Sequence, residues 1–127
     1  MELTVWQRAH DLALLVHRVT EKFPRSARFG MVMQMRRAAY SIAANIAEGF
    51  GRGTTRELLQ SLKVARGSTE EVRYFLILSS DLGHLSQELR GQGFQKCDSV
   101  GQLINALGRS LKGRLSTSHK SRVTSHG

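Results

Sequence analysis

The fold of this chain is constrained most by apolar residues that recur at alternating spacings of three and four positions. Four segments of the sequence carry this pattern. Residues spaced in this way lie on one stripe of an α-helix, and other apolar side chains must cover that stripe. Four stripes on helices of roughly 20–27 residues, joined by short turns, predict an all-α domain. The predicted architecture is an antiparallel, up-down-up-down four-helix bundle.

The predicted core consists of the residues on these four stripes. The first helix begins near Thr4 and is closed by Pro24, and its stripe comprises Val5, Ala9, Leu12, Val16, Val19 and Phe23. The second stripe comprises Val32, Met35, Ala39, Ile42 and Ile46, and ends at Phe50. The third comprises Leu58, Leu62, Ala65, Thr69, Val72 and Leu76. The fourth comprises Leu89, Gly93, Cys97, Val100, Ile104, Leu107 and Leu111.

Capping residues predict where three of the helices begin. Thr4 with Gln7 and Thr54 with Glu57 have the spacing of a capping box, in which two side chains satisfy free amides of the first turn. Ser86 is a suitable N-cap for the last helix.

Two segments are expected to depart from regular helix. Gly91 and Gly93 occupy the first turns of the last helix, and their low helix propensity predicts a frayed or irregular start. Residues 113–127 contain too little apolar surface to offset the entropy of ordering. The predicted bundle therefore spans residues 1–112, and residues 113–127 form a disordered, basic and polar tail.

Composition bears on the number of domains and on the compartment. A chain of 127 residues with 40% hydrophobic residues makes one domain, and a single Pro with 6% aromatic residues favours helix over sheet. Cys97 is the only cysteine, so no disulfide forms within the chain. The N-terminal segment lacks the pattern of a secretory signal, and no apolar run approaches the roughly 20 residues that cross a bilayer. We therefore expect a soluble, cytoplasmic protein without a membrane partner.

The third helix carries more apolar surface than a bundle needs. Its segment Tyr74–Leu78 is apolar on all sides, whereas a bundle helix needs only one apolar stripe. Either this wide helix is buried within its own bundle, or further copies of the chain cover it. The residues expected at such a subunit interface are Leu14, Val64, Tyr74, Phe75, Leu78 and Leu82.

The charge balance points to a polyanionic partner. Nineteen Lys and Arg against ten Asp and Glu give a net charge of +9, and residues 22–66 hold nine of the bases with two of the acids. Clustered Arg side chains match the geometry of phosphate oxygens, although a basic chain is also simply soluble. The residues expected to contact nucleic acid are Arg36, Arg37, Arg52, Arg56, Lys63 and Arg66.

A polar row on the second helix has three possible roles. Arg37, Ser41, Asn45, Glu48 and Arg52 step by three or four residues and so share one helix face. This face is a solvated surface with weak ion pairs, a polar seam between subunits, or a surface that faces phosphates. The sequence leaves all three open.

The sequence argues against catalysis and cofactor binding. The Gly-rich segment 49–53 follows a helix and lacks the pattern of a nucleotide-binding loop, so we interpret it as a turn, although the free amides after it favour an anion. His10 and His17 lack metal-ligand spacing, and Asp81-x-x-His84 straddles a helix end. Cys97 falls on a core stripe and is expected to be a buried apolar residue. We therefore expect no enzyme activity, metal, cofactor or small-molecule substrate.

Several strings in the sequence resemble a known bacterial family. The strings are Val5–His10, Gln34–Ala39, Ser41–Arg52, Ala65–Ser68 and Asp81–Gly83. They resemble the "four helix bundle protein" family, whose first members were found encoded in intervening sequences of 23S ribosomal RNA genes. The likeness covers roughly residues 3–112, and the second-helix string is its most specific part. The chain departs from the family at Ala43, where Pro is frequent, and at the Gly91/Gly93 pair.

The resemblance implies an assembly as well as a fold. It implies an antiparallel four-helix bundle that forms a ring-shaped homopentamer, and this ring would cover the apolar surface of the third helix. It also implies kinship with the accessory variability determinant of diversity-generating retroelements, a basic pentamer that works with a reverse transcriptase and nucleic acid.

Together these observations predict a non-enzymatic, homo-oligomeric bundle that binds nucleic acid, in particular structured RNA, through phosphates. Sequence-specific recognition is not expected, because neither an aromatic stacking platform nor a groove-reading helix is evident. The alternative is a protein–protein adaptor, or an accessory factor for a nucleic-acid enzyme such as a reverse transcriptase.

Overall fold

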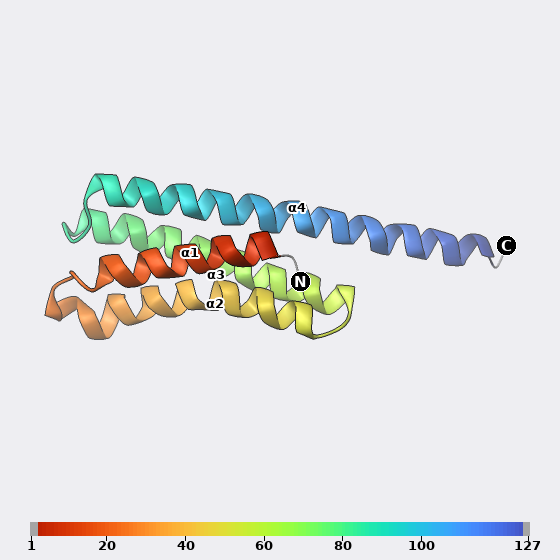
Figure 1. The fold of residues 1–127 in the computed structure, drawn as a ribbon, viewed down its shortest axis with the longest axis horizontal. Helices are drawn as coiled ribbons and strands as arrows, with labels where there is room; N and C mark the ends of the chain where they lie inside the picture. Colours follow the sequence, from red (N-terminus) through yellow and green to blue (C-terminus); the bar gives the residue numbers. More distant parts are fainter. Residues whose placement is uncertain (1–2, 126–127) are drawn as a thin grey trace.

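The computed structural model describes residues 3–125 and the side chains of residues 4–116. Four long helices account for most of this part of the chain: α1 (Leu3–Thr20), α2 (Met33–Gly51), α3 (Thr55–Asp81) and α4 (Gln87–Ser125). Successive helices lie side by side and run in opposite directions (Figure 1). The all-α four-helix bundle predicted from the apolar spacing is confirmed.

The core lies where the four stripes meet. Nearly every predicted core residue is buried, and Leu12, Met35, Ile42, Ile46 and Leu76 are among the largest side chains that are almost completely shielded from water. The structure adds Ala38 on α2 and Leu15 on α1. Short connections between long helices place each stripe against its neighbours, so the apolar period alone fixes the interior.

At two junctions between helices, the capping residues are those that the sequence predicts. The Thr54 hydroxyl oxygen accepts from the Glu57 amide at 3.1 Å at the start of α3, and Ser86 Oγ accepts from the Leu89 amide at 3.2 Å near the start of α4. Gly53 has φ 93° in the α2–α3 turn, a conformation that favours glycine. The first predicted box differs, because α1 already begins at Leu3, one residue before Thr4.

The connection between α1 and α2 is more irregular than predicted. Helix α1 ends at Thr20, and a 3₁₀ turn (η1, Arg25–Ala27) and a π-helical turn (η2, Arg28–Val32) precede α2. Phe23 is nevertheless buried, and its ring centroid lies 5.7 Å from that of His84. The core therefore retains this last stripe residue after the helix itself has ended.

The start of α4 corrects one expectation. The helix is continuous from Gln87, so the predicted irregularity at Gly91 and Gly93 is wrong. A Cβ atom at Gly93 would lie 2.7 Å from Cδ1 of Leu76, which is too close for real atoms. The absence of this side chain lets α3 and α4 approach, so tertiary contact outweighs the low helix propensity of glycine.

The C-terminal part of α4 extends past the other three helices. The structure continues this helix to Ser125, whereas the sequence favours disorder from residue 113 (Figure 1). Residues 114–125 contain no Gly or Pro, and helical hydrogen bonds form without tertiary contacts. The assignment of residues 113–127 as a unit outside the bundle stays a prediction, and residues 126–127 lie outside the described range.

One chain leaves part of its apolar surface exposed. Among the residues expected at a subunit interface, Leu14, Val64, Tyr74 and Leu82 are exposed, whereas Phe75 and Leu78 are half-buried. Phe75 packs against the core and is thereby partly covered within its own bundle. The apolar segment of α3 is therefore divided between the core and the surface.

Candidate functional site

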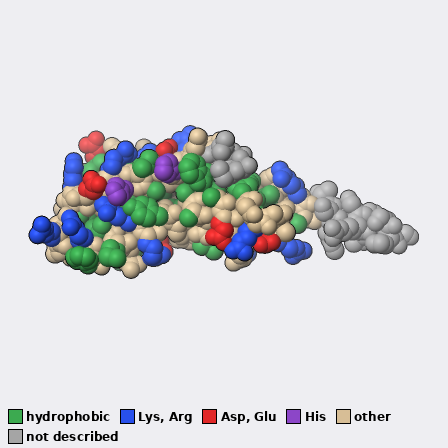
Figure 2. All heavy atoms as spheres, turned by 60° about the horizontal axis from the view of Figure 1, so that its bottom comes forward, with side chains coloured by type: hydrophobic (Ala, Val, Ile, Leu, Met, Phe, Trp, Pro, Cys, Tyr) green, Lys and Arg blue, Asp and Glu red, His purple; other side chains and the backbone are tan. Residues whose placement is uncertain are grey.

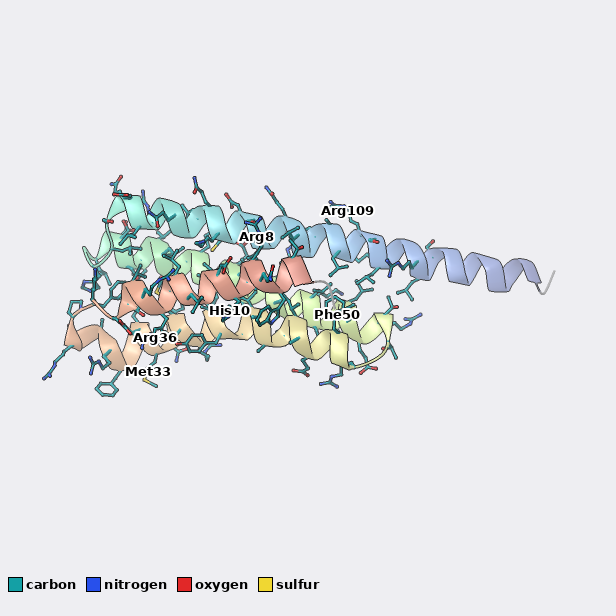
Figure 3. All side chains as sticks on the ribbon, viewed as in Figure 1. Arg8, His10, Met33, Arg36, Phe50 and Arg109 are labelled. Atoms are coloured by element: carbon teal, nitrogen blue, oxygen red, sulfur yellow. The ribbon has the colours of Figure 1, made fainter. Side chains whose placement is uncertain are left out.

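The arginines expected to form one nucleic-acid surface serve different purposes in the structure. Arg36 lies between α1 and α2 (Figure 3). Its Nε donates to the Thr20 hydroxyl at 2.8 Å, and its Nη2 donates to the His17 carbonyl at 3.2 Å. The guanidinium thus satisfies a carbonyl in the last turn of α1, where a cation also complements the helix dipole.

Arg37 and Arg52 are paired with carboxylates of the same chain. Arg37 Nη2 lies 2.5 Å from Glu71 Oε2, and Arg52 contacts both Glu48 and Glu57. Hydrogen bonding and charge attraction from Glu48 raise the pKa of Arg52 further above its ordinary value. These side chains are exposed, but their charge is largely offset by acids beside them.

The polar row on α2 proves to be mainly a seam within the bundle. The Ser41 hydroxyl donates to the Ser68 hydroxyl at 2.5 Å, and Arg37 reaches Glu71, so two members of the row contact α3. Asn45 Nδ2 donates to the Ser41 carbonyl at 2.7 Å. These groups are satisfied within one chain, through contacts with α3 that none of the three interpretations from the sequence had named.

Arg56, Lys63 and Arg66 remain exposed and have no ion pair with any described side chain. Lys63 and Arg66 also lie together on α3, on the wall of a groove between α3 and α4. Two of the six predicted contact residues therefore share this groove, while Arg36 and Arg37 line a separate hollow on α2.

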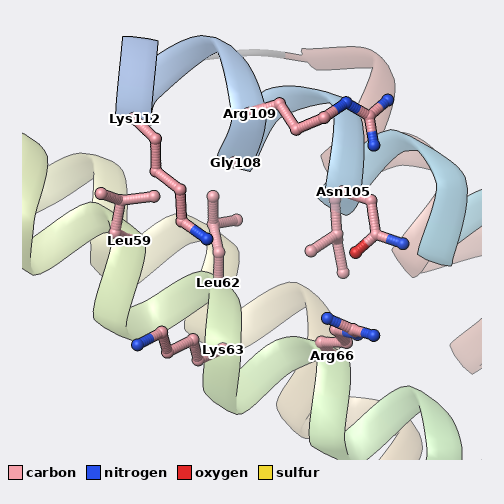
Figure 4. Close-up of a pocket in the computed structure, with 9 residues that line it drawn as sticks. Leu59, Leu62, Lys63, Arg66, Asn105, Gly108, Arg109 and Lys112 are labelled. Carbon is pink, nitrogen blue, oxygen red and sulfur yellow. The ribbon is translucent and has the colours of Figure 1, made fainter. Parts of the chain in front are cut away.

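The α3/α4 groove is the candidate functional site. It has a volume of about 250 Å³ and is lined by Leu59, Leu62, Lys63, Arg66, Ile104, Asn105, Gly108, Arg109 and Lys112. In Figure 4, Lys63 and Arg66 lie on α3, while Arg109 and Lys112 come from α4 on the opposite side. Each helix contributes two cations spaced three residues apart, so each pair lies on one face of its helix.

The groove collects four cations without any acid to offset them. None of the described residues that line it is Asp or Glu, and none of the four cations has an ion pair or hydrogen bond to a described side chain. Like charges held close together repel each other, and an anion between them removes that repulsion. The site is therefore suited to phosphate groups.

Arg109 and Lys112 are the site residues that sequence reasoning missed. They lie outside the basic segment 22–66, and only the pairing of α3 with α4 places them opposite Lys63 and Arg66. A signal was present in their three-residue spacing and in the small residue Gly108 beside them, but neither indicates which helix they face.

An apolar area on the outer side of α2 was also missed. Phe29 is 84% exposed, Met33 56% and Tyr40 46%. Met33 points away from the bundle in Figure 3, and the face of the molecule in Figure 2 shows hydrophobic side chains among Lys and Arg. Met33 and Tyr40 line a shallow hollow with Arg36 and Arg37. This area adds to the exposed apolar residues of α3.

Cys97 and His17, which were considered for reactivity or metal binding, each have contacts or burial that fit a structural role. Cys97 is completely buried, and burial raises the pKa of its thiol to about 12, so it is an apolar core residue as predicted. His17 lies between the Tyr40 hydroxyl at 2.8 Å and the Glu21 carboxylate at 3.2 Å. In the described part of the chain, no three His, Cys, Asp or Glu gather as metal ligands, and no helix could span a membrane.

Comparison with known proteins identifies the family. The model of the family described as 23S rRNA-intervening sequence protein matches residues 1–106. The chain belongs to this family. The resemblance carried by its sequence strings is thereby confirmed, and the groove residues Lys63, Arg66 and Asn105 fall within the matched part. A search of curated proteins found no match.

A solved structure similar to this family member comes from Bacteroides thetaiotaomicron. It is described as a protein of unknown function from the S23 ribosomal protein family. The two chains are 20% identical, the match covers 84% of this chain and 96% of the other, and the TM-score is 0.76. At this identity the likeness establishes the shared fold alone.

Proposed function

We propose that this protein is a non-enzymatic, homo-oligomeric bundle that binds nucleic acid through the α3/α4 groove. The ligand is structured RNA or DNA, and the contacts are made with backbone phosphates. The four unpaired cations of the groove are the observation that carries this proposal, because like charges that line one groove repel each other and a phosphate between them offsets that repulsion.

Phosphate contacts account for most of the affinity of proteins that bind nucleic acid without sequence preference. Four cations in one groove contact a phosphate chain at several points, and a repeated groove in an oligomer multiplies this attraction. Arg109 and Lys112 now replace Arg36, Arg37 and Arg52 as the expected contacts, because the latter three already have partners in their own chain.

The proposed oligomer rests on apolar surface. The side chains of Phe29, Met33, Tyr74 and Leu82 are all more than half exposed in one chain. Exposed patches of this kind mark interaction sites, and repeated copies of one chain are the simplest cover. The pentamer follows the family resemblance. Light scattering at micromolar concentration is expected to give about five times the chain mass, and a monomer would contradict the assembly.

The binding proposal is tested with a variant that removes only the charges of the groove. In this groove variant, Gln replaces Lys63, Arg66, Arg109 and Lys112. Binding of a hairpin RNA and of its DNA counterpart is measured by filter retention over a salt series. Wild type is expected to weaken steeply as salt rises, with a log–log slope of about −3 for four contacts, and the variant is expected to lose on the order of a hundredfold in affinity.

A matched control removes the same number of charges at the opposite end of the bundle. In it, Gln replaces Arg18, Lys22, Arg25 and Arg28, which are exposed and unpaired among the described side chains. This control is expected to lose less than tenfold, because long-range attraction is screened over about 10 Å at 0.1 M salt. Equal losses in the two variants would overturn the groove as the site. Absence of wild-type binding at low salt would overturn nucleic-acid binding and favour the adaptor function.

A further inference from the structure

We propose that the α3/α4 groove accepts an unpaired nucleotide, whose phosphates contact the four cations while its base lies on the apolar floor. This inference rests on the proposed function and names the part of the nucleic acid that enters the site. It predicts that the protein prefers single-stranded segments, such as the loop of a hairpin, over a duplex.

The floor of the groove is the first reason. Leu62 and Ile104 lie beneath it at 3% exposure, and Leu59 forms part of the same apolar surface. Leu62 and Ile104 are already shielded from water, whereas Leu59 is half-buried, so phosphate groups bound to the rim would leave Leu59 facing water. A nucleobase has two largely apolar faces, and burying one face here removes apolar surface of both partners from water.

The shape of the groove is the second reason. The groove between the neighbouring helices α3 and α4 has a volume of about 250 Å³, so it has room for part of a single strand and not for a duplex. A Cβ atom at Gly108 would have no heavy atom within 4 Å, so this glycine leaves open space in the wall. In a duplex the bases are stacked inside the helix, whereas unpaired bases can turn outward into such a space.

The polar groups on the walls fit a base as well as a phosphate. Asn105 lines the groove between the cation pairs, and its amide offers both donors and an acceptor to a base edge. Arg66 rises from α3 below Asn105 in Figure 4, and a planar guanidinium can stack on a base. No aromatic side chain lines the groove within the described chain, so little discrimination among the four bases is expected.

The experiment compares three RNA probes that carry similar numbers of phosphates. They are an unstructured strand of about 12 nucleotides, the same strand with abasic positions, and a short duplex, all measured by fluorescence anisotropy. Wild type is expected to bind the intact strand at least about fivefold more tightly than the abasic strand or the duplex, which corresponds to one base contact.

A variant at Gly108 tests the groove itself without changing its charge. Gly108→Leu fills the open space, and Gly108→Ala is the matched control with a much smaller side chain. Both substitutions favour helix, so circular dichroism and thermal unfolding are expected to show an intact fold. The leucine variant is expected to lose the preference for the intact strand and to keep its affinity for the abasic strand and the duplex. The alanine variant is expected to retain most of the preference.

The outcomes separate this inference from the proposed function. Equal wild-type binding of all three probes would overturn the inference and leave phosphate binding intact. A preference that survives in Gly108→Leu would also overturn it, because the base would then bind outside the groove. Loss of all binding in wild type would overturn both proposals, whereas the groove variant lacking four cations is expected to lose all three probes together.

Discussion

The polar row on α2 and the α3/α4 groove are both rich in cations. The cations of the row have acidic partners, whereas those of the groove have none among the described side chains. Arg37 on α2 contacts Glu71, and Arg52, which directly follows α2, contacts Glu48. In the groove, Lys63 and Arg66 face two further cations and no acid among the described lining residues. A count of charges along the sequence does not distinguish the two regions. The difference lies in whether the fold supplies a carboxylate beside each guanidinium.

This contrast shows that a basic residue indicates a binding site only when its own chain leaves it unpaired. An arginine in an ion pair must give up that contact before it can bind a phosphate, so the gain on binding is small. An unpaired cation among other cations gains from the anion directly.

The first prediction concerns Cys97, which lies on the buried side of α4 and not on the side that carries the groove cations. Burial raises the pKa of the thiol from 9.0 to about 12. Between these values the unfolded chain loses the thiol proton while the folded chain keeps it, so stability falls as pH rises. The fall is about 1.4 kcal/mol for each pH unit above 9.

Urea unfolding at pH 8.5 and pH 10.5 measures this effect against Cys97→Ala. The alanine variant is expected to be less stable at pH 8.5 and to show a smaller decline between the two pH values. The same decline in both proteins would show that the thiol is not the source. Groove binding is expected to remain at pH 8.5 in the variant, because the floor residues are unchanged.

The second prediction concerns Arg36, which the contrast assigns to the fold. Arg36→Met keeps much of the side-chain volume but removes the bonds to Thr20 and to the His17 carbonyl. We expect a loss of about 1.5 kcal/mol in the free energy of unfolding, because the part-buried Thr20 hydroxyl and His17 carbonyl lose their charged donor. RNA affinity is expected to change less than threefold. A large loss of RNA affinity with unchanged stability would contradict the assignment of Arg36 to the fold.

The third prediction converts the paired row of α2 into a binding surface. Replacing Glu48, Glu57 and Glu71 by Gln releases Arg37 and Arg52 from their acids. Retention of hairpin RNA at low salt is expected to rise about fivefold, since two arginines become available to phosphates. A matched control, Asp11→Asn with Asp81→Asn and Glu88→Gln, removes three exposed acids that have no ion pair with a described side chain and is expected to produce a smaller rise. Equal rises would show that net charge, and not pairing, governs affinity.

The fourth prediction places an acid near the groove cations, in the way that acids lie beside the arginines of the polar row on α2. Asn105→Asp places a carboxylate between the cation pairs. Affinity for RNA is expected to fall several-fold, while the free energy of unfolding rises by a few tenths of a kcal/mol through relief of repulsion. Thermal unfolding and anisotropy on the same preparation measure both quantities, and Asn105→Ala is the control that removes the amide without adding charge. A fall in both quantities would contradict unpaired cations as the basis of binding.

Sequence reasoning predicted the fold far more completely than the site. The spacing of Leu12, Ile42 and Leu76 identified core positions because helix geometry converts spacing in sequence directly into a side of the helix. The Thr54 cap followed from contacts within four residues. Gly93 was misjudged because its propensity is a local property, whereas its role is set by Leu76 on another helix. The irregular α1–α2 connection was missed for the same reason, since Phe23 is held by tertiary contact.

The amino-acid sequence by itself determined four helices, the sides they bury and a large excess of positive charge, since each depends on residues near one another along the chain. Only the tertiary structure decided which charges are free. Arg37 meets Glu71 across 34 positions, and Lys63 and Lys112 line the same groove, because both arrangements depend on how neighbouring helices are aligned. Electrostatic pairing depends on distance in space, and helix alignment sets that distance.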